Sequence, residues 1–494
     1  MSIIRIKSIE QSVNETFEER HSLKRSLGAL DLAVMGVAVA VGAGIFSVGA
    51  QAVAFYAGPS AIISFVIAGL VCALAIMCYA EFASAVPVAG SAYTFTYSTM
   101  GEIVAWIIGW DLILETLMAG SVISKYWGIY LTDAFALFSI NIPTTVTIAG
   151  INVDWGPMVI VAAFTVLLAL GTKLSTRVNA VFTAIKVGIV IFVVIVGAFF
   201  IKAENFTPFI PASQPNTEST AVLEQSLFSF LTGADPSNYG VYGILSGAAL
   251  VFFAYIGFDV VATSAEEAKD PKRTIPRGIL LGLGIVTVLY ISVAVVVTGM
   301  VSYTDLAASD SPSLSTAFEL VGATWAAKVI TVGILIGLTT VVMVLLLGLT
   351  RIVFAMSRDG LLPRALSVTS ERRRTPVRLQ ILVGIVIALI AGLTDVGVLS
   401  DMINIGTLSA FVLVSFGVPV LRRSRPDLER PFRVPLSPWL PWASGVACIW
   451  LMLNLSNLTW IRFAIWLLIG FVIYFSYSRR HSLVGQASGA HEPR

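Results

Sequence analysis

Val37-Ala-Val-Ala-Val-Gly-Ala-Gly-Ile-Phe46 is the stretch that decides the fold. It lies within an apolar run long enough to cross a hydrocarbon core of about 30 Å as a helix, yet it places Gly42 and Gly44 at mid-membrane. Each glycine weakens a helix by roughly 1 kcal/mol relative to alanine. An opened helix exposes N–H and carbonyl groups, which a membrane tolerates only against a cavity. The plainer explanation is close helix packing, for which membrane helices also use glycine.

A second interruption occurs at residues 247–259, which read Gly-Ala-Ala-Leu-Val-Phe-Phe-Ala-Tyr-Ile-Gly-Phe-Asp. It lies five apolar spans after the first. Because five is odd, a second copy of a five-span unit must enter the membrane upside down. Interrupted helices at matching places in two inverted halves indicate a transporter binding site. Helix N-terminal amides can hold a carboxylate and freed carbonyls can hold an ammonium, so the pattern suits an α-amino acid.

The composition of the whole chain agrees with a membrane protein. Of its 494 residues, 57% are hydrophobic and 12% are charged, whereas a soluble domain carries about 25% charged residues. Apolar runs such as residues 187–200 do not alternate with polar residues, which disfavours a β-barrel. We therefore predict an all-α integral membrane protein with about twelve spans.

Lysines and arginines set the expected orientation. With the N-terminus inside, the inner loops and tails receive 26 of the 31 basic residues. We expect a multi-pass protein of the plasma or cytoplasmic membrane with both termini in the cytoplasm. The expected segments are a cytoplasmic N-terminal tail (1–28), a first repeat of five spans (29–202), an extracellular loop (203–240), a second repeat of five spans (241–421), a loop with two further spans (422–479) and a cytoplasmic C-terminal tail (480–494).

Several function classes fit the sequence poorly. The net charge of +2 gives no reason to expect nucleic acid as a partner. The three histidines lie in the polar tails, which counts against a membrane enzyme, and no spacing suggests a metal site or a cofactor. The three cysteines lie in apolar stretches and are expected to be core residues. An amino acid sensor lacking transport stays a remote alternative, since both tails are short.

Motifs on four expected spans carry a family resemblance. They are Gly42-Ala-Gly-Ile-Phe46, Gly109-Trp-Asp-Leu-Ile-Leu-Glu115, Phe253-Ala-Tyr-Ile-Gly-Phe-Asp259 with Glu266-Glu-Ala-Lys-Asp-Pro-Lys-Arg-Thr-Ile-Pro276, and Arg351-Ile-Val-Phe-Ala-Met-Ser-Arg-Asp-Gly-Leu-Leu-Pro363. With these motifs in this order, the chain resembles the amino acid–polyamine–organocation (APC) superfamily. Within it, the chain looks like bacterial homologues of the cationic amino acid transporter family. The resemblance covers about residues 22–435.

The resemblance implies a LeuT/APC-type fold, a 5+5 inverted repeat plus two C-terminal helices, with substrate between the first and sixth spans. Ala43 departs from the Ser or Thr common in the family, so a hydroxyl contact is lost there. Phe253 would also form part of a gate. The implied binding residues are Gly42, Ala43, Gly44 and Ile45 for the carboxylate, through backbone amides, and Val41 with the carbonyls of Phe253, Ala254 and Ile256 for the ammonium.

Lys186 is expected to carry the coupling. It lies nine residues after Arg177, about 13 Å into the fifth span, where a charge is a functional hypothesis by default. Snorkelling to the inner surface or static pairing with a carboxylate is the structural alternative. In proton-coupled members of the superfamily a fifth-span lysine takes the place of a sodium ion, and Lys186 resembles that residue in position.

Acidic residues give weaker signals. Glu115 and Asp111 share a face of the third span, and Glu115 is expected to pair with Lys186, tune the proton site or meet a cationic substrate. A structural carboxyl is the alternative. Asp259 is expected to cap the lower half-helix, and Asp31 to be structural. A gating salt bridge between Glu266 or Glu267 and the arginines 372–374 stays open beside simple lipid contact.

We therefore expect a secondary active amino acid permease. It would take up L-amino acids together with protons by alternating access, with small neutral (alanine-like) or cationic (lysine, arginine, ornithine) specificity. An amino acid exchanger is the alternative. The expected partners are the L-amino acid, protons and the lipid bilayer. A small accessory membrane subunit, or a sterol or lipid, is left open.

Overall fold

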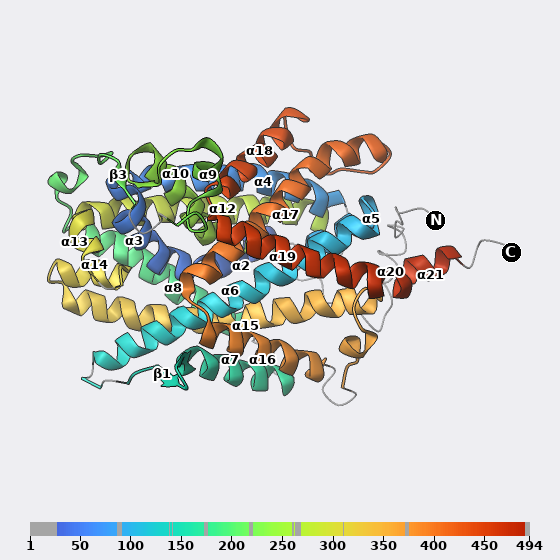
Figure 1. Ribbon diagram of the computed structural model, residues 1–494, viewed down its shortest axis with the longest axis horizontal. Coiled ribbons are helices and arrows are strands. Elements are labelled where there is room, and N and C mark those ends of the chain that lie inside the picture. The colour runs from blue at the N-terminus through green and yellow to red at the C-terminus, as the bar shows by residue number, and fades with distance from the viewer. Residues whose placement is uncertain are drawn as a thin grey trace.

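The computed structural model describes residues 27–85, 91–137, 139–140, 142–171, 176–216, 221–258, 261, 268–309, 311–370 and 375–489. Asp259, Glu266, Glu267 and the arginines 372–374 lie outside these residues, as do residues 1–26 and 490–494 of the tails. The described chain is nearly all helical, and its long helices run side by side along one axis (Figure 1). This confirms the predicted fold class at the level of an all-helical membrane protein.

Seven stretches of helix in the described residues are long and apolar enough to cross a membrane. They contain α4 (Ala61–Ala85), α6 (Glu102–Ala136), α8 (Thr176–Ala198), α12 (Pro271–Met300), α15 (Thr324–Arg358), α17 (Val396–Ser424) and α19 (Asn457–Ile473). Five further apolar segments are shorter. They contain α2 (Ala29–Ala40), α7 (Trp155–Ala169), α10 (Gly240–Val251), α16 (Val377–Leu393) and α18 (Trp439–Leu453).

The remaining elements are short connections. Two antiparallel hairpins pair β1 (Thr145–Ile148) with β2 (Ile151–Asp154), and β3 (Gln214–Pro215) with β4 (Ser237–Asn238). β3 and β4 fall in the loop 203–240, which the sequence predicts to be extracellular. The short helices are α3 (Gly49–Gln51), α5 (Ser91–Thr99), α9 (Leu227–Thr232), α13 (Tyr303–Ala307), α14 (Leu314–Leu320), α20 (Arg479–His481) and α21 (Leu483–Gly489), with 3-10 turns at Gly58–Ser60, Ala203–Phe206 and Arg364–Ser367 and π-helical turns at Ala52–Ala57 and Tyr474–Ser478.

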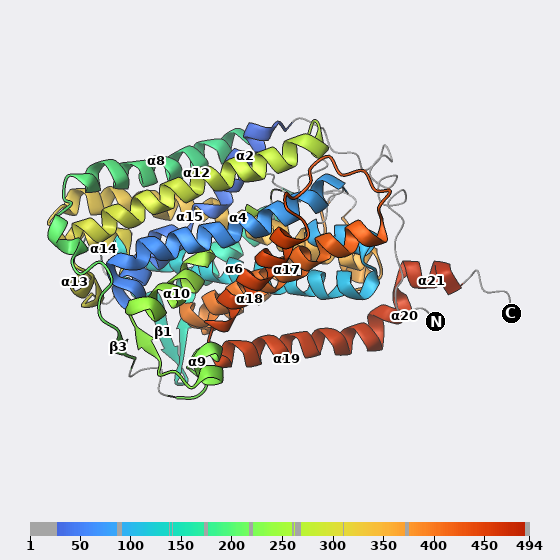
Figure 2. The same ribbon diagram turned by 90° about the horizontal axis from the view of Figure 1, so that it is seen from above.

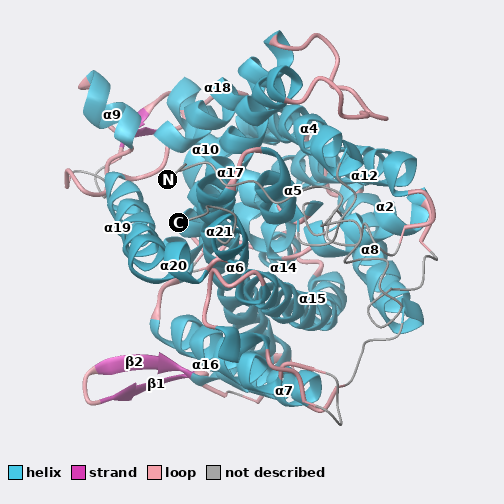
Figure 3. Ribbon diagram, turned by 90° about the vertical axis from the view of Figure 1, so that its right-hand side faces the viewer, coloured by secondary structure: helices cyan, strands magenta, loops and turns pink. Residues whose placement is uncertain are grey.

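The helices differ in how deeply they are buried. Figure 3 looks along the bundle and shows α6 and α17 inside it, α7 and α16 side by side at its lower edge, and α19 on its outside. Most of α6 and α17 is buried, whereas only a minor part of α19 is buried. The buried helices carry the polar side chains Asp111, Glu115 and Asn404, which an apolar surface facing lipid would not accept.

Contacts between loops and helix ends define the two ends of the bundle. At one end, the Leu27 segment pairs with Ala268 before α12, Ser478 Oγ donates to Leu361 O after α15, and Leu483 N donates to Asp359 O. At the other end, Lys202 N donates to Gly299 O, joining the end of α8 to the end of α12. Figure 2 shows α20 and α21 at the first end and α13 and α14 at the second.

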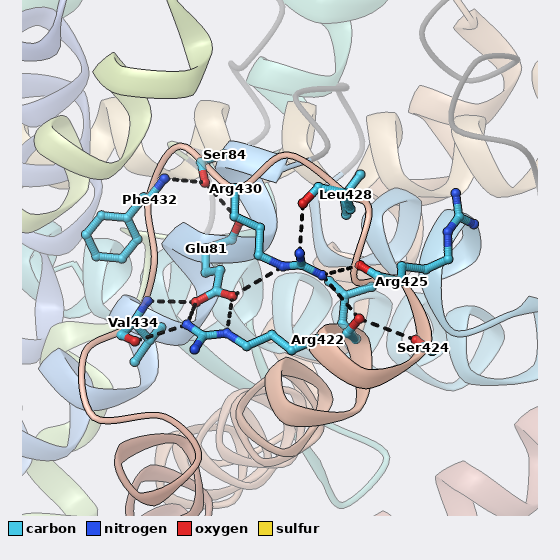
Figure 4. A network of polar contacts seen from close by, with 10 residues as sticks. Glu81, Ser84, Arg422, Ser424, Arg425, Leu428, Arg430, Phe432 and Val434 are labelled. Carbon is cyan, nitrogen blue, oxygen red and sulfur yellow. Dashed lines mark hydrogen bonds and ion pairs between the residues drawn. The ribbon is translucent and has the colours of Figure 1, made fainter.

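A buried ion-pair network closes the first end (Figure 4). Glu81, at the end of α4, is fully buried and accepts from Arg422 Nε at 2.8 Å and Arg422 Nη2 at 2.6 Å. The Val434 N–H donates to the same carboxylate at 2.7 Å, and Arg430 Nε lies 3.8 Å from it. Two-point Arg–carboxylate contacts fix geometry as well as charge. The network therefore ties α4, α17 and the loop after α17 together.

Candidate functional site

Both interruptions predicted from glycines are present. The first apolar helix, α2, ends at Ala40, and the chain turns at Val41 and Gly42 before it resumes in a π-helical turn, η1 (Gly44–Val48). In the second, α10 passes into a 3-10 turn, η6 (Phe252–Tyr255), and Ile256 is extended. Gly257 then has φ +118°, a conformation that glycine adopts without the penalty of a Cβ.

Glycine lets the two interruptions touch. A Cβ on Gly44 would lie 2.4 Å from Ala254 Cα, so backbone meets backbone there and no side chain can move aside. A Cβ on Gly257 would lie 2.5 Å from Val39 Cγ1. These contacts bring two segments more than 200 residues apart into one site. Here glycine serves close packing as well as an open helix, so the two sequence interpretations are not exclusive.

The carbonyls freed at the interruptions have partners that the sequence did not predict. A helix end leaves its last carbonyls without an intrahelical N–H. Tyr290 Oη, from α12, lies 2.6 Å from Ala40 O and 2.9 Å from Ala254 O. A hydroxyl has one proton to donate, so Tyr290 serves one carbonyl at a time and stands between both interruptions.

Lys186 serves another freed carbonyl. Its side chain is 1% exposed, and its Nζ donates to Ala38 O at 2.5 Å. The stem crosses α15 at Gly337, where a Cβ would lie 2.6 Å from Lys186 Cγ. The fifth-span lysine therefore reaches from α8 past α15 to the end of α2. In this conformation Lys186 Nζ has a backbone partner, and pairing with Glu115, one of three roles expected for that carboxyl, stays a prediction.

A small cavity lies between the interruptions. Its volume is about 40 Å³, and a water needs about 10–15 Å³ by the same measure, which leaves room for roughly three waters. Its aliphatic wall comes from α6 and α15, and its single ionisable side chain among the described residues is Glu115. The lining residues are Val39, Ala40, Gly42, Ala43, Gly44, Glu115, Thr116, Ala119, Ile123, Phe253, Ile256, Gly257, Val341 and Leu345.

Most of the predicted site residues meet at this cavity. Of the proposed binding set, Gly42, Ala43, Gly44, Phe253 and Ile256 line it. Val41, Ile45 and Ala254 are buried beside it but are not part of the lining. The sequence indicated the backbone positions because glycine marks them locally. It missed Tyr290, whose signal would have been a tyrosine midway along an otherwise largely aliphatic span.

Asp111 and Glu115 lie where α6 meets α17. Glu115 is 4% exposed and faces the cavity, and Asp111, one turn before it, is 1% exposed. Asp111 Oδ2 bonds to Ser409 Oγ of α17, whereas Asp111 Oδ1 is buried and has no hydrogen-bond partner. Asp31, in contrast, accepts from the Gly28 N–H at 2.8 Å at the start of α2, which is the expected structural role.

A second, polar cavity lies at the end of the bundle that carries the β3–β4 hairpin. Its volume is about 170 Å³, and its lining includes Glu224, Asp401, Asn238 and Tyr242. The described lining residues include neither lysine nor arginine. This cavity is larger and more polar than the one between the interruptions.

Comparison with known proteins places the chain in a family. Residues 27–483 match the sequence model of the amino acid permease family. The branched-chain amino acid permease BcaP of Bacillus subtilis (strain 168) is 42% identical over 98% of this chain and 99% of its own length. The methylthioribose transporter of the same organism is 40% identical over 94% of this chain and 96% of its own length.

A plant relative extends the comparison. The vacuolar cationic amino acid transporter 4 of Arabidopsis thaliana is 36% identical over 88% of this chain and 69% of its own length. These relatives are permeases and transporters, which confirms the prediction that the chain is not an enzyme. With two interrupted helices meeting at a buried cavity and a family match over nearly its whole length, the chain belongs to the amino acid permease family of the APC superfamily.

Proposed function

We propose that the protein takes up neutral, aliphatic L-amino acids together with protons, and binds them in the cavity between the two interruptions. The observation that carries the proposal is the cavity lining, in which backbone from both interruptions lies beside the aliphatic side chains of Ile123, Val341 and Leu345. The N–H groups that begin a helix at Ala43 suit a carboxylate. The aliphatic wall suits an alkyl side chain.

Overall similarity does not select the substrate. The relatives named for branched-chain amino acids and for methylthioribose are almost equally similar to this chain. The side chains of the cavity wall are the better guide to the substrate, because they would contact it. A cationic amino acid is the second candidate, since Glu115 places one carboxyl in the lining and several relatives are named cationic amino acid transporters.

Alternating access would use an inverted repeat. The proposed halves are residues 29–202 and 241–421, each with five spans, in a LeuT-type arrangement of about twelve spans in all. The twelve apolar helical segments in the described part of the chain, and the position of an interruption in each half, support this proposal.

The basic end of the bundle is proposed to face the cytoplasm of a cell membrane. Arg422, Arg430, Arg364 and Arg479 belong to segments at the end that holds α20 and the Glu81 network. The end that carries the β3–β4 hairpin and the polar cavity would then face outward.

Lys186 is the proposed proton carrier. Protonated, it donates to Ala38 O and braces α2 against α8, as the 2.5 Å contact supports. Hydration of the site on inward opening would let the proton and the substrate leave. The alternative is an amino acid exchanger, in which Lys186 keeps its proton and one amino acid crosses only in exchange for another.

Proteoliposome uptake tests the proposal. Purified protein would receive radiolabelled leucine, alanine, lysine, arginine and methylthioribose, with and without an inward proton gradient, in empty and preloaded vesicles. Gradient-driven accumulation of leucine or alanine in empty vesicles is expected. Uptake that requires preloading and ignores pH would replace symport by exchange, and preference for lysine or arginine would replace the aliphatic substrate.

Two variants isolate the role of Lys186. Lys186→Ala is expected to lose gradient-driven accumulation while the protein remains abundant. Gly337→Ala is also expected to lose gradient-driven accumulation, because its Cβ would lie 2.6 Å from Lys186 Cγ and displace the ammonium from Ala38 O. The matched control is Gly348→Ala on the same helix, where the nearest atom would be 3.8 Å away. Full accumulation by Lys186→Ala would refute the coupling role.

A further inference from the structure

Asp111 is a buried carboxyl that the proposed transport cycle does not use. Its side chain is 1% exposed and lies on α6, the most buried of the long helices. Oδ2 bonds to Ser409 Oγ of α17, and Oδ1 is buried with no partner. Among the described residues, no lysine or arginine forms an ion pair with it.

The hydrogen-bonding groups around Asp111 distinguish its two protonation states. An ionised carboxylate only accepts, so both of its oxygens need donors. Here one oxygen has none, and an unpaired charge in an apolar site costs far more than an unpaired neutral group. A protonated carboxyl needs one acceptor for its O–H, and Ser409 Oγ supplies it. Ser409 can then give its own proton to Gly406 O, 2.9 Å away.

The backbone of α17 lies close to Asp111 Oδ1. A Cβ added at Gly406 would lie only 3.3 Å from this oxygen and 3.7 Å from Glu115 Cβ, so α17 backbone packs directly against both acids. Glycine at position 406 therefore gives α17 its close approach to α6. The seam between these helices is tight at Asp111.

The charged and titratable groups on neighbouring elements either lie far from Asp111 or carry no positive charge that could pair with it. On α17, Asp401 and Arg422 lie eight residues before and thirteen after Ser409, about 12 and 20 Å along the helix. On α15, Arg351 and Arg358 are exposed. The remaining groups on α6 and on the helices packed against it are Glu102, Glu115, Lys125, Tyr126, Tyr130 and Asp133 on α6, Tyr93 and Tyr97 on α5, Lys328 on α15, Arg378 on α16, Arg423 on α17 and Arg462 on α19.

We propose that Asp111 is a second proton-binding site, and that its proton joins α6 to α17 through Ser409. The proton keeps the contact between α6 and α17 closed to water. This contact lies one turn from the cavity-lining Glu115. Loss of the proton leaves a carboxylate with one oxygen lacking a donor between two helices, a state that is stabilised only when water enters between them. The inference does not depend on which substrate is carried or on the coupling role proposed for Lys186.

Infrared spectroscopy of the purified protein tests this directly. The wild-type spectrum at neutral pH is compared with that of Asp111→Asn, in water and in heavy water. We expect the variant to lose the C=O band of one protonated carboxylic acid, and we expect that band to shift in heavy water. The matched control is Asp305→Asn on α13, an exposed acid, which is expected to remove an ionised-carboxylate band instead.

A second variant covers the case in which Asp111→Asn does not fold. Ser409→Ala removes the acceptor of the proposed O–H, so the carboxylic acid band is expected to persist and to move in frequency. Loss of an ionised-carboxylate band in Asp111→Asn, or an unchanged acid band in Ser409→Ala, would overturn the proposal. Neither spectrum requires transport, so a failed uptake experiment and a failed proton site give separate results.

Discussion

At the scale of single residues, Tyr290 joins the two interruptions through one hydroxyl. Tyr290→Phe removes this group and keeps the ring, which packs against Phe65 and Tyr255. A hydrogen bond contributes about 0.5–1.5 kcal/mol. We expect an apparent substrate affinity weaker by about twofold to tenfold, since the freed carbonyls of Ala40 and Ala254 lose a donor.

Concentration-dependent uptake measures this effect. The control is Tyr303→Phe, because Tyr303 lies at the start of α13 and is not among the residues that line the cavity. An unchanged KM for Tyr290→Phe, with normal protein abundance, would mean that its contacts hold no part of the site in place.

Gly44 gives a steric prediction. Gly44→Ala would place a methyl group 2.4 Å from Ala254 Cα, so the interruptions must separate and uptake is expected to be lost. Gly188→Ala is the matched control, because nothing lies within 4 Å of its added Cβ. The control should transport normally, with helix stability equal to or up to about 1 kcal/mol above that of the parent chain. Wild-type uptake by Gly44→Ala would contradict the close approach.

At the scale of elements, the Glu81 network should govern stability more than any exposed ion pair. Glu81→Ala leaves Arg422 and Arg430 without their carboxylate, and breaking a buried pair costs about 3–5 kcal/mol. The exposed Lys272–Glu429 pair supplies the control, since Glu429→Ala should cost less than about 1 kcal/mol. Thermal unfolding in detergent measures both, and equal melting temperatures would show that the network adds nothing.

Of the two interrupted helices, the sequence could predict the position of each interruption but not its partners. Glycine at positions 42, 44 and 257 marks the interruptions, because a missing Cβ acts locally and can be found without a structure. The partners of the freed carbonyls could not be found that way, since Tyr290 and Lys186 reach them across tertiary contacts. α6 has 35 residues, from Glu102 to Ala136, whereas about 20 suffice to cross a hydrocarbon core. The added turns include polar residues that are tolerated beyond a hydrocarbon core.

At the scale of the whole molecule, orientation can be read with introduced cysteines. The three native cysteines, Cys72, Cys78 and Cys448, are fully buried and free, so background labelling should be low. A membrane-impermeant maleimide is expected to label Ser302→Cys, before α13, from outside intact cells. It should label Glu429→Cys, in the loop after α17, only after permeabilisation. The reverse pattern would invert the proposed topology.

The unequal cavities have a consequence for the path of a solute. A solute moving from the polar cavity of about 170 Å³ into the central one of about 40 Å³ would have to leave most of its water behind. The loss of hydration water costs an alkyl group no free energy, whereas it costs a charged group far more. On such a path, the small central cavity would select solutes by the free-energy cost of removing their hydration water, before they contact its lining.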